Sequence, residues 1–177
     1  MDRPYFGNFA DGNNPHNLPV YILALDDEHY LEIGRIAAHV GTLEYLVQKL
    51  LWWMMGLTEK QGRSLTVATR TETQLEAIEV LLASGKPENM TQRENIALVL
   101  AEVRTARSLR HDVVHAIWLP EWQDHDVKPV AMKVARKRGK DNTRTPYSSK
   151  QLAQIARDVH RVYSETRRLL NELGVQQ

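Results

Sequence analysis

The stretch YLEIGRIAAHVGTLEYLVQKLLWWMM, residues 30–55, decides the fold, because apolar residues recur in it every three and four positions. This period predicts a helix of about eight turns that runs from Asp27 to Met55 and ends at Gly56. The apolar side chains of this predicted helix cover most of its circumference. We therefore expect it to be buried on two sides, as in the interior of a helical bundle.

Three further segments show the same helical period. They are TETQLEAIEVLLASGKP (71–87), TQRENIALVLAEVRTARSLRHDVVH (91–115) and SSKQLAQIARDVHRVYSETRRLLNELG (148–174). The last two begin with predicted capping boxes, Thr91 with Glu94 and Ser148 with Gln151. Residues 116–147 differ, because Val130, Met132 and Val134 alternate with Ala131 and Lys133 in a pattern typical of a β-hairpin. The predicted fold class is all-α: an up-and-down bundle of about four helices, with a small β-hairpin or irregular excursion between the third and fourth.

Length and composition indicate one domain over residues 27–177, preceded by an irregular segment rich in Gly, Asn and Pro over residues 1–26. The absence of cysteine excludes disulfides, thiolate metal sites and cysteine nucleophiles. The apolar run of residues 46–57 is too short to span a bilayer, and the first residues lack a signal-peptide core, so we expect a soluble cytoplasmic protein without a membrane partner. The chain has 23 basic and 22 acidic residues, so its net charge is close to zero. A surface that binds nucleic acid would therefore need local clustering of basic residues.

An arginine interrupts the apolar stripe of the third predicted helix, in the sequence RHDVVHAIW of residues 110–118. The helical period places Arg110 on the same face as Val103 and Val114. A buried guanidinium is costly without a carboxylate, a group of carbonyls or a cavity open to a ligand. Glu44, which lies on an apolar face of the first helix, is the predicted partner of Arg110. An alternative is that such an ion pair only fixes the register of the two helices.

His115 follows Arg110 by five residues and lies about 140° around and about 7.5 Å along an ideal helix from it. One straight helix therefore does not bring the two side chains together. Two arrangements would: the helix unwinds near His115, or two copies of the chain pack so that the residues of one complete the site of the other.

Arg110, followed by His111 and then by His115, resembles the Arg-x4-His motif of the HEPN superfamily. The resemblance extends over residues 27–173: a first helix with GTLEYLVQKLL, the motif at the end of a later helix, Trp118 shortly afterwards, and a long closing helix. It implies a compact helical domain, commonly a homodimer whose motifs face each other. In many members it also implies metal-independent endoribonuclease activity in toxin or phage-defence systems, with an antitoxin protein as a further partner.

The roles expected from this resemblance fit the chemistry of RNA cleavage without a metal or another cofactor. His115 would act as general base or acid, and Arg110 would bind the scissile phosphate. His111 would serve as a second acid or base or would orient the RNA, and Asp112 would hold an imidazole tautomer. Ile117 occupies the position of a tyrosine in HEPN toxins paired with nucleotidyltransferases, so modification at that position is not expected.

Two other features of residues 111–144 remain open from the sequence. The basic residues Lys133, Arg136, Lys137 and Arg138 either contact RNA phosphates beside the motif or form a solvated loop. His111 and His115 have the spacing of two metal ligands on one helix, but nothing in the sequence fixes a third ligand, so we predict no metal site.

Two functions therefore compete. The first is a metal-independent HEPN-type ribonuclease that is active as a homodimer. The second is a non-catalytic HEPN-like module that binds RNA, a nucleotide or a protein partner, with Arg110 buried for structural reasons. Catalysis needs Arg110 and His115 within reach of one phosphate in an open site, whereas the module tolerates an Arg110 sealed against Glu44.

Overall fold

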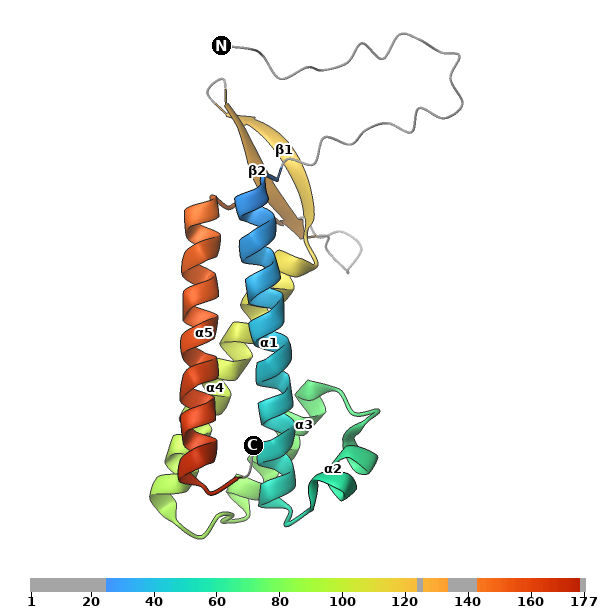
Figure 1. Ribbon diagram of the computed structural model, residues 1–177, viewed down its shortest axis with the longest axis vertical. Coiled ribbons are helices and arrows are strands. Elements are labelled where there is room, and N and C mark those ends of the chain that lie inside the picture. Colours follow the sequence, from blue (N-terminus) through green and yellow to red (C-terminus); the bar gives the residue numbers. More distant parts are fainter. Residues whose placement is uncertain (1–24, 124–125, 134–142, 176–177) are drawn as a thin grey trace.

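The computed structural model describes residues 25–123, 126–133 and 143–175, and these residues form five helices and one small antiparallel sheet. Figure 1 shows α1 and α5 side by side with α4 crossing behind them, the sheet at one end of the bundle, and α2 and α3 at the other end. The mainly helical bundle is confirmed, but the described helices number five rather than about four. Their bounds are α1 Asp27–Met54, α2 Glu59–Thr66, α3 Thr71–Ala83, α4 Met90–Val114 and α5 Ser149–Glu172.

Helix α1 begins and ends close to the predicted positions. The Asp26 carboxylate accepts a hydrogen bond from the backbone N–H of His29, which satisfies one of the free donors of the first turn. The chain leaves the helix through Gly56, whose φ of 69° suits a residue without a side chain. Burial on two sides is confirmed, because α1 contacts each of the other four helices.

Helix α2 was not predicted from the sequence. Thr58 and Gln61 form a capping box at its start, and the helix packs against the buried side chain of Trp52. A Cβ atom at Gly62 would overlap the Trp52 ring, so the glycine allows this close approach. Trp52 Nε1 also donates a hydrogen bond of 3.1 Å to Thr66 Oγ1. This contact connects the C-terminal end of α1 to α2.

The long helices α4 and α5 differ in how well their starts were predicted. Asn89 caps α4, where the sequence indicated Thr91. The capping box of Ser148 and Gln151 at the start of α5 is as predicted, and so is the end of the helix near Gly174, which has a φ of 73°. The main core lies between α1, α3, α4 and α5, and a smaller core of Ile36, Val113, Leu152 and Ala156 lies toward the sheet.

The predicted hairpin between the last two helices is confirmed and carries a third strand. Strands β1 (Ile117–Gln123), β2 (Asp126–Lys133) and β3 (Thr143–Pro146) pair antiparallel in the order β1-β2-β3. The sheet packs against α4 and places Val130 and Ala131 among the buried residues. Only the last two residues of the predicted N-terminal segment 1–26 belong to the described part of the chain.

Within the described ranges, every helix is too short or too polar to cross a membrane.

Candidate functional site

Arg110 and His115 lie together at the end of α4 in a single chain. The helix ends at Val114, and His115 is its C-terminal cap, with φ −101° and ψ 7°. Arg110 Nη1 lies 3.5 Å from His115 Nε2, slightly beyond the usual length of a hydrogen bond. Of the two arrangements that the sequence left open, the helix end therefore brings these two side chains together without a second copy.

His111 directly follows Arg110 and lies about one turn before His115. Its ring centre lies 5.1 Å from that of His115, and the two ring planes are tilted by 54°. Both histidines are exposed. The site thus places two exposed imidazoles and one guanidinium within residues 110–115, and these groups can perform acid–base chemistry on a phosphate ester.

Arg110 is half-buried, and its guanidinium is incompletely satisfied. Its Nε atom is buried and has no hydrogen-bond partner within the described part of the chain. Among the described residues, the one side-chain contact of its guanidinium is with the imidazole of His115. A positive charge that no described carboxylate neutralises favours an anion, and a guanidinium can offer a phosphate two parallel N–H groups.

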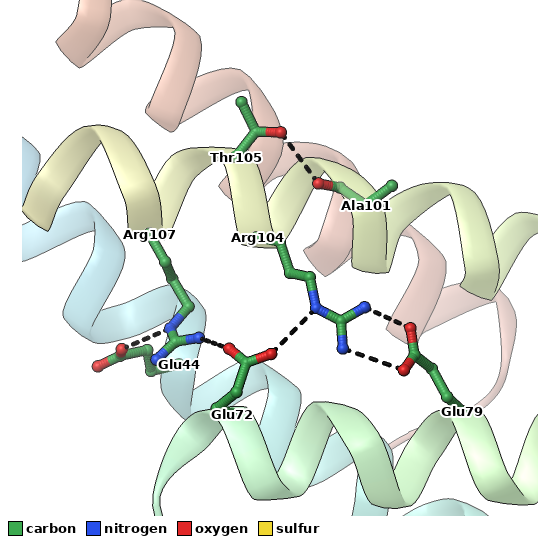
Figure 2. A network of polar contacts seen from close by, with 7 residues as sticks. All are labelled: Glu44, Glu72, Glu79, Ala101, Arg104, Thr105 and Arg107. Carbon is green, nitrogen blue, oxygen red and sulfur yellow. Dashed lines mark hydrogen bonds and ion pairs between the residues drawn. The ribbon is translucent and has the colours of Figure 1, made fainter.

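Glu44 is not the partner of Arg110, which corrects the expectation from the sequence. The Glu44 carboxylate instead accepts a hydrogen bond of 3.1 Å from Nε of Arg107, one turn earlier on α4 (Figure 2). The helical period identified the correct face of α4. The position along α4 at which Glu44 contacts it depends on how α1 and α4 cross, which the period does not give. Arg110 is therefore left without this carboxylate.

Arg107 belongs to an ion-pair network that fixes α4 against α1 and α3. Its Nη1 lies 2.6 Å from Glu72, which also accepts a bond of 3.2 Å from Arg104, and Arg104 in turn pairs with Glu79 (Figure 2). The hydrogen bond from Arg107 is the largest cause that lowers the pKa of Glu72, and the one from Arg104 adds to it. The network ends one turn before Arg110, so it holds the C-terminal part of α4 in place.

The sheet is fixed to the end of α4 by Trp118. Its indole Nε1 donates a hydrogen bond of 3.1 Å to the backbone oxygen of Val113, an acceptor in the last turn of the helix. The ring lies near Tyr147, with 6.0 Å between ring centres, and near His29 at 6.5 Å. Trp118 therefore packs the excursion onto the bundle, whereas the side chain of Trp122 lies outside the described part of the chain.

His29 is a structural contact that the sequence did not reveal. The ring is buried, with Nδ1 2.6 Å from the Asp26 carboxylate and Nε2 3.1 Å from the backbone oxygen of Tyr147. These contacts connect the start of α1 to the residues just before α5. A lone histidine in a helix shows no periodic or motif signal, so only the fold identifies its partners.

The strand register places the base of the basic loop near the motif. Ile117 pairs with Met132, and Lys133 pairs with Thr143, so β2 ends beside the point where β1 leaves His115. The predicted contacts of Arg136, Lys137 and Arg138 lie outside the described residues, as does the side chain of Lys133. The backbone on either side of the loop is nevertheless held at the motif end of the sheet.

The other two expectations for this site concern Asp112 and a metal. Asp112 is half-buried in the last turn of α4. The described residues contain no group of three His, Asp or Glu side chains placed to hold a metal ion.

Comparisons of the chain with protein-family models, with curated proteins and with solved structures give no match.

Proposed function

We propose that this protein is a metal-independent endoribonuclease of HEPN type, whose reaction takes place at the exposed end of α4. The observation that carries the proposal is the contact of 3.5 Å between Arg110 Nη1 and His115 Nε2 in one chain. It brings a permanent cation and a titratable base within reach of the same phosphate. The HEPN resemblance of the motif supports the same assignment.

In the proposed reaction, the 2′-hydroxyl of one nucleotide attacks the neighbouring phosphorus atom. An imidazole takes the hydroxyl proton, the bond from phosphorus to the 5′-oxygen breaks, and that oxygen receives a proton. The products are a 2′,3′-cyclic phosphate and a free 5′-hydroxyl. His115 is the proposed base or acid because it contacts Arg110, and His111 is the second group because its ring lies 5.1 Å away.

Arg110 is the proposed phosphate-binding residue. Because its Nε is buried, its Nη1 and Nη2 would be the two parallel donors to phosphate oxygens, and the fixed positive charge would stabilise the negative charge that develops in the transition state. An unneutralised arginine is more useful here than one paired with Glu44, because a carboxylate partner would compete with the substrate. Asp112 is the proposed supporting residue that orients an imidazole.

RNA is the proposed substrate, and the basic loop is the proposed additional contact. Lys133 ends β2 next to the motif end of the sheet, and Arg136, Lys137 and Arg138 follow it in the sequence. Each phosphate that these residues neutralise would add salt-dependent, sequence-independent affinity.

A homodimer is the proposed active form. The resemblance implies that two motifs face each other, and the 48% exposure of Ile117, two residues after His115, supports an interface at this end. The resemblance also suggests an effector of a toxin or phage-defence system that acts on RNA in the cytoplasm, with an antitoxin protein as its regulator.

The proposal is tested by incubating the purified protein with assorted RNAs in EDTA, beside Arg110→Ala and His115→Ala. Arg168→Ala is the matched control, because this exposed arginine of α5 makes one long ion pair of 3.7 Å with Glu172. We expect cleavage with cyclic phosphate ends in the wild type and the control, and its loss in the two motif variants. RNA binding without cleavage would support the non-catalytic module instead.

A further inference from the structure

A groove between α1 and α5 carries a second concentration of basic side chains. It has a volume of about 290 Å³, and the described residues that line it all belong to these two helices. None of the described residues of α4 or of the sheet lines it, so it is separate from the site at Arg110. Its lining residues are Glu32, Arg35, His39, Ala153, Ala156, Arg157, His160 and Arg161.

The shape of the groove follows from small residues on α5. Ala153 and Ala156 face α1 where the two helices pack, as Figure 1 shows for the helices themselves. Their short side chains leave space that the long side chains of Arg35 and Arg157 border without filling. A cavity of this size lies at the lower end of the range for ligand sites, so it suits an ion or a small metabolite.

The charge in the groove is unevenly neutralised. Glu32 pairs with Arg35 at 2.7 Å, and Arg161 pairs with Glu102 and Glu165 on its other side. Arg157 differs, because its described hydrogen bonds, of 2.6 and 3.3 Å, go to the uncharged amide oxygen of Gln154. Its full charge is therefore available to an anion in the groove.

Two imidazoles and a phenol lie beside these arginines. The ring centres of His39 and His160 are 4.8 Å apart, and Tyr163 stacks on His39 with 6.3 Å between centres and 25° between planes. Each protonated imidazole would add a positive charge and an N–H donor. Arginine and histidine donors that converge on one small space are the usual means of binding a tetrahedral oxyanion.

We propose that the α1–α5 groove binds a phosphate group, either as inorganic phosphate or as the monoester of a small metabolite, with Arg157 as its principal charged contact and His39 and His160 as further donors. This site is independent of the proposed RNA cleavage, since the two share no residue.

Binding at this site would be linked to proton uptake. Burial is the largest cause that lowers the pKa of His39, and the nearby charges of His160 and Arg35 lower it further. The groups that face His39 are Glu32 and Arg35 from α1 and Arg157, His160, Arg161 and Tyr163 from α5. A bound dianion reverses the balance of charge, so it favours protonated His39 and binds more tightly as the pH falls.

Sulfate is the most direct probe of this linkage, because it stays a dianion over the pH range in which histidine titrates. We would follow the imidazole resonances of the full chain by NMR during titration with sulfate at constant ionic strength. Inorganic phosphate and ribose 5-phosphate, at a fixed pH, then distinguish the free ion from a monoester. The variants are Arg157→Gln and His39→Gln, with Arg168→Gln as the charge-matched control on α5.

We expect sulfate to shift His39 and His160 selectively, to raise the pKa of His39, and to bind roughly threefold to tenfold more tightly at pH 5.5 than at pH 7.5. Arg157→Gln should weaken binding by a similar factor, His39→Gln should remove most of the pH dependence, and Arg168→Gln should change neither. A shift that sodium chloride reproduces, or equal binding by Arg157→Gln and the control, would overturn the proposal.

Discussion

Arg110 Nη1 lies 3.5 Å from His115 Nε2 across the point where α4 ends at Val114. The contact needs an unprotonated Nε2, because an arginine can only donate. In that form the imidazole can accept a proton, and it lies next to a charge that attracts phosphate. A phosphate that binds Arg110 would take over the donor and leave His115 Nε2 facing the substrate.

Replacing His115 with alanine should reduce the cleavage rate by about 10² to 10⁴ and leave RNA affinity nearly unchanged. The reason is that proton transfer stabilises only the transition state, whereas binding depends on the arginines and lysines. Single-turnover cleavage together with fluorescence anisotropy measures the two quantities separately. Undiminished cleavage in this variant would remove His115 from the mechanism.

Arg110→Lys should reduce cleavage by about 10², even though the charge is kept. An ammonium group cannot offer the two parallel donors of a guanidinium, so it stabilises the negative charge on the phosphate oxygens less well in the transition state. Arg107→Lys is not a suitable control, because Arg107 binds Glu44 and Glu72. Arg168→Lys on α5 is suitable and should retain wild-type activity. Equal rates for Arg110→Lys and the wild type would show that charge alone suffices.

The helical period alone predicted most of the bundle. The parts that it missed, helix α2 and the start of α4, depend on contacts that a periodic pattern does not contain. Helix α2 was missed because it is short and polar, and its position depends on the fit of Gly62 against Trp52. The start of α4 was predicted at Thr91 because Thr91 and Glu94 have the spacing of a capping box. The N-cap is Asn89, a residue that can also cap a helix but lies outside that pattern. Local pattern fixes the existence of a long helix better than its ends.

The candidate site was predicted as a set of residue types but not as a set of contacts. Arg110, His111 and His115 were identified from the motif, and the structure places them together. The pairing of Glu44 was wrong by one turn, because a helical period gives the direction of a side chain and not the crossing point of two helices. Arg107 could be found only from that crossing.

Ile117→Asp should weaken self-association at least roughly tenfold if a homodimer forms around the α4 end. Ile117 is 48% exposed beside His115, and a charge buried at such an interface would lack a partner. Val80→Asp is the matched control, since Val80 is 69% exposed on α3, which lies at the other end of the bundle (Figure 1). Light scattering over a range of concentrations measures both. A wild-type protein that remains monomeric would remove the proposed interface.

Glu72→Gln should lower the free energy of unfolding by about 1 kcal/mol or less at pH 7. Glu72 is half-exposed, so solvent screens its bonds to Arg107 and Arg104, and each arginine keeps its other carboxylate, Glu44 or Glu79. Glu76→Gln, on the exposed face of the same helix, is the control and should have little effect. Urea unfolding at several pH values measures both.

The pH dependence of this difference follows from the lowered pKa of Glu72, which Arg107 causes first and Arg104 second. A carboxylate with a lowered pKa stabilises the fold fully above its unfolded pKa, near 4.5, and loses that contribution as the pH falls through the folded pKa. The stability gap between the wild type and Glu72→Gln should therefore be constant from pH 7 to about pH 5 and should close below pH 4.5. A gap that stays constant down to pH 3 would show that the charge of Glu72 does not stabilise the fold, and that the network in Figure 2 aligns α3 and α4 by its geometry alone.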